Sequence, residues 1–404
     1  MKIRDYAYFT RGVSYRKGDS RKTYESEFVP ILRANNLVDN RFCFDDLIYV
    51  PKTLVDDEQM IFKDDIVITM SSGSKSHVGK IALATRNIEA GFGAFCGKLK
   101  PFNIYPAYLA YLLQSQLFRN HIEQKCKGTN INNIRQNHIL DFDFDPPPRP
   151  EQERIVARIE ELFSQLDAAV VELNAIREKL QIYRQAVLKE AFECASNSDR
   201  NFCSIDRLLS KSKRGMTTGP FGTMLKKEEH QRSGVPVLGI ENIGTGCFCP
   251  GNKIFITEEK AKELEAFKVV SGDIIISRSG TVGEICAVPD NIGEAYLSTN
   301  LIRISLDNSV IRSDYFVFLF QSKGVVLDQV KEICKGSTRI FLNQTILKQI
   351  KFPVPSLEIQ KDIVEKIEYR LSACKNIDRT IDTALQHTTA LRQSILKQAF
   401  EGNL

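Results

Sequence analysis

A long amphipathic segment that occurs twice places the strongest constraint on how this chain folds. The first copy runs from Pro146 to Glu193 and the second from Val354 to Glu401. Arg392 minus Arg184 gives a displacement of 208 residues, and residues near the start of each copy keep the same register. Identical pairs at this displacement include Pro147 and Pro355, Gln152 and Gln360, Ile155 and Ile363, Lys189 and Lys397, and Phe192 and Phe400. The chain is therefore an internal duplication.

Apolar residues in each copy recur at alternating steps of four and three residues. This heptad pattern is typical of a long helix that buries one stripe against a partner helix. Arg370 and Thr388 interrupt the second stripe, where we expect looser packing or a polar contact that sets the register. The predicted helix-pair seam consists of Ile155, Ile159, Leu162, Leu166, Leu173, Ile176, Leu180 and Val187 in the first copy, and Ile363, Ile367, Ile377, Ile381, Leu391 and Ile395 in the second.

The length of each copy argues for a helix that extends beyond one small domain. A helix from Glu151 to Glu193 has a length of about 65 Å at the usual rise per residue. A single stripe of this kind also fits a coiled-coil homodimer. Because both copies lie in one chain, an intramolecular antiparallel pair requires less loss of chain entropy, and we favour it.

The segments between the copies contain short runs of β-branched and aromatic residues punctuated by Gly and Asn, which predict strands. Val235–Asn242 corresponds to Val29–Asn36, and Asp273–Ser277 corresponds to Asp65–Thr69. We therefore predict an α+β chain with internal pseudo-two-fold duplication, in which two similar mixed α/β globular domains are joined by two long antiparallel coiled-coil helices. The expected boundaries are 1–145 and 196–353 for the domains, and 146–195 and 354–404 for the helical regions.

Composition and motifs give no support for an active site in this chain. The segment Gly73–Ile81 has one residue too many between its glycines for a phosphate-binding loop, and Ile81 replaces the Ser or Thr that binds magnesium. Asp145–Pro148 resembles the Asp/Asn-Pro-Pro-aromatic motif of adenine methyltransferases, but Pro148 replaces the aromatic residue that stacks on a flipped base. The five histidines form no metal-ligand pattern, and ten cysteines without a CxxC pair indicate free thiols in a reducing cytoplasm. We expect no catalytic residue, no metal and no cofactor in this chain, and no membrane span.

Polar loops at matched places in the two domains carry groups suited to reading DNA. Asn pairs with the edge of adenine and Arg with O6 and N7 of guanine, while free backbone amides approach phosphates. Cys334–Thr338 corresponds to Cys126–Asn130 at the displacement of the repeat. The candidate DNA-binding residues are Arg33, Asn35, Asn36, Lys75, Lys80, Thr129, Asn130, Asn132, Asn133, Arg135, Asn242, Arg278, Ser279, Thr281, Lys335, Ser337, Thr338 and Arg339.

The order of domain, helix, domain and helix resembles the specificity subunit of type I restriction-modification enzymes. The resemblance rests on the helix start with Pro147, Gln152 and Ile155, and on the helix endings Arg184–Glu193 and Leu391–Gly402. Ile276–Gly283 is similar to a turn frequent in the target-recognition domains of that family. The resemblance covers essentially the whole chain.

The resemblance implies a non-catalytic subunit in which each domain reads one half of a bipartite asymmetric target in double-stranded DNA. The helices would set the spacing between the halves and dock two methyltransferase subunits, and motor-nuclease subunits would complete the complex. S-adenosylmethionine, ATP and Mg²⁺ would bind those partners. The competing hypothesis is a coiled-coil scaffold whose globular domains bind proteins instead of DNA.

Overall fold

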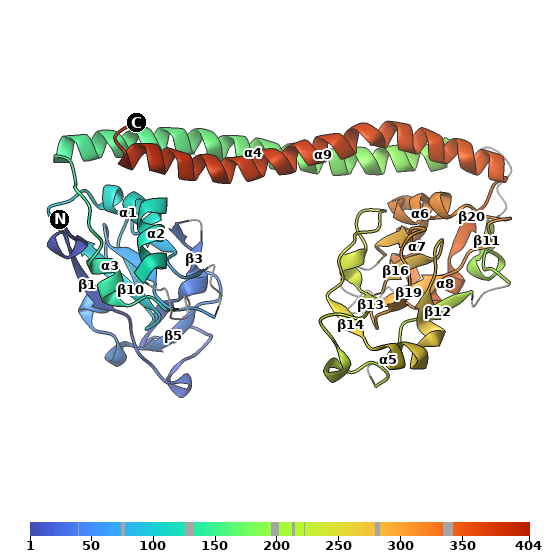
Figure 1. Ribbon diagram of the computed structural model, residues 1–404, viewed down its shortest axis with the longest axis horizontal. Coiled ribbons are helices and arrows are strands. Elements are labelled where there is room, and N and C mark those ends of the chain that lie inside the picture. Colours follow the sequence, from blue (N-terminus) through green and yellow to red (C-terminus); the bar gives the residue numbers. More distant parts are fainter. Residues whose placement is uncertain are drawn as a thin grey trace. The chain divides into compact units, whose positions relative to one another are not determined.

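The structure is a computed structural model that describes residues 1–38, 40–73, 77–125, 133–194, 202–211, 215–221, 223–278, 283–333 and 342–404. It contains two compact units (Figure 1). The first unit comprises Met1–Leu173 with Asp382–Leu404, and the second comprises Asn174–Ile381. The chain passes from one unit to the other after Leu173 and again after Ile381. These two positions are 208 residues apart (381 minus 173), which is the displacement of the sequence repeat. Each unit therefore holds one globular domain and a part of both long helices.

The first domain is built on two four-stranded sheets. One is antiparallel with strand order β1-β10-β7-β8, and the other has the order β5-β2-β9-β6 with β2 and β9 parallel. A short hairpin of β3 and β4 lies beside them. The bounds are β1 Ala7–Arg11, β2 Phe28–Leu32, β3 Leu37–Val38, β4 Arg41–Phe42, β5 Ile48–Pro51, β6 Met60–Ile61, β7 Ile66–Thr69, β8 Ile81–Leu83, β9 Ile88–Phe92 and β10 Cys96–Pro101.

The second domain repeats both sheets strand for strand. Its orders are β12-β19-β16-β17 and β14-β13-β18-β15, with β13 and β18 parallel. The predicted correspondence of Asp65–Thr69 with Asp273–Ser277 is confirmed, because β7 and β16 hold the same place in their sheets. The bounds are β11 Phe202–Ser204, β12 Met216–Thr218, β13 Val235–Leu238, β14 Ile254–Ile256, β15 Lys268–Val269, β16 Ile274–Ser277, β17 Ile285–Ala287, β18 Ala295–Leu297, β19 Leu301–Ile304 and β20 Lys351–Pro353.

Strands β7 and β16 are buried along their whole length because both faces of the antiparallel sheet are covered. In β7, Ile66 and Ile68 belong to the core shared with the helices, whereas Val67 belongs to the core beneath the mixed sheet. In β16, Ile274 and Ile275 divide in the same way. Period-two alternation with both faces covered gives continuous β-branched runs.

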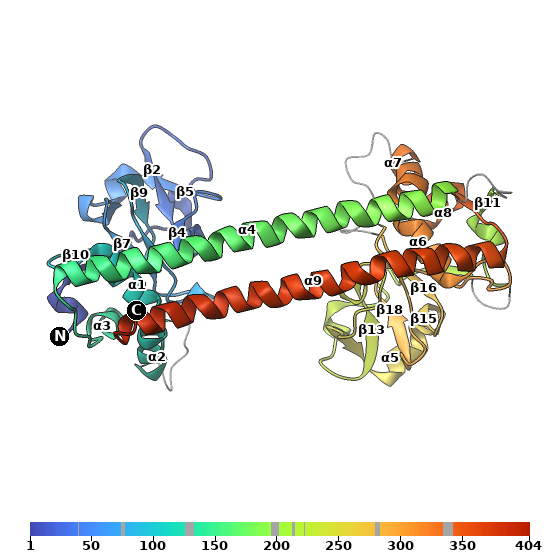
Figure 2. The same cartoon turned by 90° about the horizontal axis from the view of Figure 1, so that it is seen from above.

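Helices cover the outer face of each antiparallel sheet, and the long helices pack onto them (Figure 1). In each unit the long helices α4 and α9 lie side by side (Figure 2). Within the described residues, no helix combines the length and the apolar character needed to cross a membrane. The bounds are α1 Pro106–Gln114, α2 Gln116–Lys125, α3 Gln136–Leu140, α4 Arg149–Cys194, α5 Glu258–Glu263, α6 Ser313–Gln321, α7 Asp328–Ile333, α8 Gln344–Gln349 and α9 Leu357–Phe400.

A buried glutamine fixes the start of each long helix to its own globular domain. Gln152 is 4% exposed; its Oε1 accepts from the N–H of Tyr105 at the start of α1 (2.8 Å), and its Nε2 donates to the carbonyl of Pro147 (2.8 Å). Gln360 accepts from the N–H of Arg312 before α6 (2.9 Å) and donates to the carbonyl of Pro355 (2.8 Å). Both ends of each amide are satisfied, so the entry of each helix is fixed by hydrogen bonds as well as by packing.

The matched helix endings pack in the opposite unit from the one in which their helix begins. Phe400 at the end of α9 meets Tyr108 of α1 edge to face, with ring centroids 5.3 Å apart. Phe192 near the end of α4 meets Tyr315 of α6 in the same manner at 5.6 Å. Each globular domain is therefore held by the start of one long helix and by the end of the other.

In each domain the cation of a buried ion pair joins the antiparallel sheet to the mixed sheet through a hydrogen bond. Lys98 on β10 lies 3.0 Å from the carboxylate of Asp65, and their side chains are 3% and 1% exposed. The Lys98 Nζ also donates to the carbonyl of Met60 on β6 (2.8 Å). In the second domain Arg303 lies against Asp273, and its guanidinium donates to the carbonyl of Lys268 on β15. A change of cation from Lys to Arg preserves this link.

We predict that Lys98→Met destabilises the first domain, because it leaves the buried Asp65 carboxylate without its cation. The loss in the free energy of unfolding should be about 3–5 kcal/mol, measured by denaturant unfolding of the chain. Lys100→Met, on the exposed position of the same strand, is the matched control and should change it by less than about 0.5 kcal/mol. Equal stability of the two variants would contradict a structural role for the ion pair.

Candidate nucleic-acid interface

Three segments meet at one edge of the antiparallel sheet in the first unit. The connection after β7 starts at Met70, the turn between β9 and β10 contains Phe95, and Ile134 precedes α3. The N–H of Met70 donates to the carbonyl of Phe95 (2.8 Å), and the N–H of Ile134 donates to the carbonyl of Met70 (2.7 Å). We call this the loop edge of the first unit, with the described residues Met70–Gly73, His77–Lys80, Gly93–Phe95 and Asn133–Arg135.

The second unit has a loop edge made by the equivalent hydrogen bonds. The N–H of Arg278 donates to the carbonyl of Asn300 (3.0 Å), and the N–H of Leu342 donates to the carbonyl of Arg278 (3.0 Å). Gln344 donates from Nε2 to the Thr218 hydroxyl (3.0 Å), which joins the end of β12 to this edge. The described residues of this loop edge are Thr218–Phe221, Arg278, Ser298–Asn300 and Leu342–Gln344.

A close backbone approach at each loop edge requires glycine. A Cβ on Gly12 would lie 2.1 Å from the carbonyl oxygen of Gly93, and a Cβ on Gly219 would lie 1.8 Å from that of Ser298. Both distances are far below van der Waals contact, so a side chain at either glycine would force the two backbone segments apart. The turn that contains Gly93 and the turn that contains Ser298 are therefore each held closely against a neighbouring segment.

Only four of the candidate residues in the predicted loops lie within the described part of the loop edges. Lys80, Asn133 and Arg135 lie on the loop edge of the first unit, and Arg278 lies on that of the second. Asn133 and Arg135 are exposed, whereas Lys80 and Arg278 are half-buried. The remaining candidates in these loops lie outside the described residues: Lys75, Thr129, Asn130, Asn132, Ser279, Thr281, Lys335, Ser337, Thr338 and Arg339.

Asn36 and Asn242 are corrected from candidate DNA contacts to structural residues. Both are 0% exposed. The Asn36 Oδ1 accepts from the N–H of Arg33 (2.9 Å), and its Nδ2 donates to the carbonyls of Cys43 and Asp45 (3.0 and 2.7 Å). Asn242 makes the equivalent bonds in the second domain. These amides organise a turn and have no face toward solvent, which the sequence alone did not distinguish from a loop that reads bases.

Arg33 and Asn35 differ from the buried asparagines. Asn35 is exposed. The Arg33 side chain is 30% exposed and pairs with the Asp46 carboxylate at 3.0 Å, and a Cβ on Gly93 would lie 3.8 Å from its Cγ. Arg33 therefore borders the loop edge, but its charge is already partly neutralised by Asp46.

Two cysteine thiols in the antiparallel sheets, Cys96 on β10 and Cys286 on β17, are buried. Burial raises the pKa of the Cys96 thiol to about 12, and burial does the same for Cys286. The cysteines that the structure describes are free thiols, and these two stay protonated at neutral pH. Over the described ranges, no group of three or more His, Cys, Asp and Glu side chains is arranged to hold a metal ion.

Arginines link the two long helices within each unit. In the first unit Arg392 of α9 pairs with Asp167 of α4 and lies over the ring of Phe163, 4.6 Å from its centroid. In the second unit Arg184 of α4 pairs with Asp378 of α9. The predicted interruption at Arg370 is a polar contact, because Arg370 pairs with Glu190 of α4 at 2.7 Å.

Thr388, the other interruption, is buried and donates its hydroxyl to the carbonyl of Ala384 one turn earlier (2.9 Å). It therefore remains on the covered face of α9.

Burial along the predicted helix-pair seam is uneven. Ile176 and Ile377 are 42% exposed and Leu391 is 50% exposed, so these positions are corrected from buried seam to partly exposed surface. Leu162, Leu166, Leu173 and Ile395 are half-buried. The buried members are Ile155, Ile159, Leu180, Val187, Ile363, Ile367 and Ile381. Several of the buried positions owe their burial to the helices of the globular domains as well as to the partner helix.

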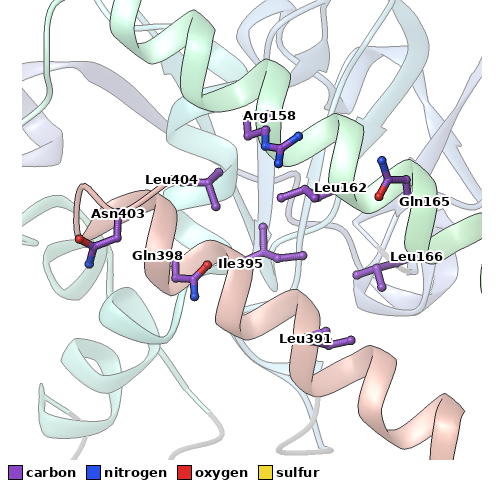
Figure 3. Close-up of a pocket in the computed structure, with 9 residues that line it drawn as sticks. All are labelled: Arg158, Leu162, Gln165, Leu166, Leu391, Ile395, Gln398, Asn403 and Leu404. Carbon is purple, nitrogen blue, oxygen red and sulfur yellow. The ribbon is translucent and has the colours of Figure 1, made fainter.

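The half-buried seam residues Leu162, Leu166 and Ile395 line an open groove between α4 and α9 in the first unit (Figure 3). Its volume is about 520 Å³. Leucine and isoleucine side chains form the floor, with polar side chains around it, so the groove combines apolar surface with hydrogen-bonding groups. The lining residues are Arg158, Leu162, Gln165, Leu166, Leu391, Ile395, Gln398, Asn403 and Leu404.

We predict that Asn36→Ala lowers the free energy of unfolding by about 1–3 kcal/mol, because buried backbone groups lose their partners. Asn35→Ala, at the exposed neighbouring position, is the control and should change stability by less than about 0.5 kcal/mol. Chemical denaturation of both variants measures the difference. A change in DNA target by Asn36→Ala with no loss of stability would restore the original assignment of Asn36 as a base contact.

Comparison with known proteins gives a family match over most of the chain. Residues 2–180 and 221–387 match the family described as the type I restriction modification DNA specificity domain. The match occurs twice, once for each half of the duplication. It includes strands β7, β10, β16 and β19 and much of both long helices.

Individual relatives agree with the family match. The chain is 30% identical over 400 residues to the specificity subunit of the type I restriction enzyme StySPI of Salmonella potsdam, covering 98% of this chain and 86% of that one. It is 30% identical over 412 residues to the specificity subunit of EcoKI of Escherichia coli K12, with the same coverage.

A solved structure has the same fold along the whole chain. It comes from work on the assembly and conformational transition of a type I restriction-modification system, and it aligns over 99% of this chain and 98% of its own with a TM-score of 0.67 at 15% identity. The family match, the sequence relatives and the fold thus agree, and the chain belongs to the type I restriction modification DNA specificity family.

Proposed function

We propose that this chain is the DNA-specificity subunit of a type I restriction-modification system. Each globular domain reads one half of a bipartite, asymmetric target in double-stranded DNA. The observation that carries the proposal is the pair of loop edges: the same backbone hydrogen bonds anchor them in both domains, while the side chains that they present differ. Such a pair presents different contacts on one scaffold, as a protein that reads two different half-sites requires.

The long helices hold the two reading domains in one chain and offer a surface for other subunits. We expect two methyltransferase subunits to dock on the helices and domains, and the groove between α4 and α9 in the first unit provides an apolar surface with a polar rim for such contacts. Motor-nuclease subunits would complete the complex in the cytoplasm. S-adenosylmethionine, ATP and Mg²⁺ would be bound by these partners and not by this chain.

The alternative function, a coiled-coil scaffold whose globular domains bind proteins, is not favoured. Relatives at 30% identity over 98% of the chain are specificity subunits of restriction enzymes. The chain itself is a non-catalytic subunit.

We predict that expression of this chain with its methyltransferase partner produces a new N6-methyladenine motif in the DNA of the cell. The motif should contain two defined halves and a spacer of fixed length. Methylation profiling of strains with and without the gene measures it. A chimaeric chain, in which residues 1–145 are exchanged for those of a relative, is the control, and it should change one half of the motif only. The same methylation pattern in the presence and absence of the gene would exclude the function.

A further inference from the structure

The two most exposed phenylalanines that the structure describes lie at the two loop edges. Phe95 is 69% exposed and Phe221 is 70% exposed. They come from different places in the repeat, since Phe95 lies in the turn between β9 and β10 and Phe221 follows the end of β12. A single exposed apolar side chain needs no explanation. One ring at each of two corresponding edges, supplied by different strand connections, suggests that each edge requires an aromatic group.

The backbone beneath each ring is held by hydrogen bonds. The carbonyl of Phe95 accepts from the N–H groups of both Met70 (2.8 Å) and Ser71 (3.1 Å). The turn is also fixed from the other side, because Gly12 lies so close to Gly93 that no side chain fits between them. The ring of Phe95 therefore projects from a turn that is held by the neighbouring loop on one side and by Gly12, the residue after β1, on the other.

Phe221 has a comparable setting in the second unit. The N–H of Gly219, two residues earlier, donates to the carbonyl of Leu301 (2.9 Å), and the intervening Pro220 is buried. The carbonyl of Phe221 accepts from the N–H of Met224 (2.8 Å). Because the backbone is fixed before binding, little conformational entropy remains to be lost when the ring makes a contact.

We propose that Phe95 and Phe221 are specificity-determining residues, each making an apolar contact with a base of the half-site that its own unit reads. This inference rests on the proposed function. Each loop edge also carries polar residues: Asn133 and Arg135 lie on the loop edge that holds Phe95, and Arg278 and Gln344 lie on the one that holds Phe221. A phenyl ring among amide and guanidinium groups matches the surface of DNA bases, which offer hydrogen-bonding edges, thymine methyl groups and apolar faces.

The main test is methylation profiling of cells that carry the full chain with its methyltransferase partner. Phe95→Ala should relax the sequence requirement at one position in one half of the motif, and Phe221→Ala should relax a position in the other half. Spacer length and the opposite half should stay unchanged in each case. Tyr24→Ala is the matched control, because Tyr24 is 67% exposed but packs against Tyr49 of the other sheet, and it should leave both halves unchanged.

Binding assays with the purified methyltransferase complex identify which part of the base is contacted. Phe95→Ala should weaken binding to the specific duplex roughly tenfold to a hundredfold, with binding to random duplex unchanged. If the ring contacts a thymine methyl, replacing that thymine by deoxyuridine weakens the unaltered complex and not the variant. If the ring rests on an unstacked base, 2-aminopurine at that position gives a fluorescence rise that Phe95→Ala abolishes.

Three results would overturn this inference. An unchanged motif in both variants excludes a role in specificity. A uniform fall in methylation with both halves intact assigns the rings to folding or to contact with another subunit. Absence of any motif with the unaltered chain would overturn the proposed function, and this inference with it, and is thereby distinguished from failure of the two phenylalanines alone.

Discussion

The hydrogen bonds of two buried glutamines determine where each long helix leaves its domain. Gln152 and Gln360 each accept from the backbone N–H of the residue just before a domain helix and donate to a proline carbonyl just before α4 or α9. The far end of each helix then packs through Phe192 or Phe400 in the other unit. Since neither domain has a complete core without both helices, folding of the domains and pairing of the helices depend on one another.

Comparison of the two duplicated domains distinguishes the residues that maintain the scaffold from the residues that differ between the domains. The sheet order, the buried Asp65 and Asp273, the turn asparagines and the close-packed glycines are shared. At the loop edges, by contrast, Met70 corresponds to Arg278 and Phe95 corresponds to Asn300 through the same backbone bonds. Backbone hydrogen bonds tolerate any side chain at these positions, so the reading surface is free to diverge while the framework stays constant.

Much of the architecture could be predicted from the sequence because the two halves of the duplication can be aligned with each other. The constant displacement predicted the two long helices and the equivalence of β7 with β16. Individual contacts were harder to predict. Gln152 and Gln360 were recognised as an identical pair in the repeat. The sequence did not show that their side chains form the hydrogen bonds that fix the start of each long helix. Asn36 and Asn242 were predicted to contact DNA because, in a sequence, an asparagine that organises a turn cannot be distinguished from one that contacts a base. Phe95 and Phe221 were not predicted because the exposure of a side chain depends on how segments distant in the sequence pack together. For the same reason Leu391 is exposed although its heptad position predicts burial.

Matched shortening of the two helices tests the central claim, that paired copies of one helix set the distance between two half-sites. Deleting 171–177 from α4 and 379–385 from α9 removes one heptad at equivalent places and keeps the stripe in register. Seven residues shorten a helix by about 10 Å, which is roughly three base pairs of DNA. Methylation profiling should then reveal a motif with both half-sites unchanged and a spacer about three base pairs shorter. An unchanged spacer in a complex that still methylates would contradict the account.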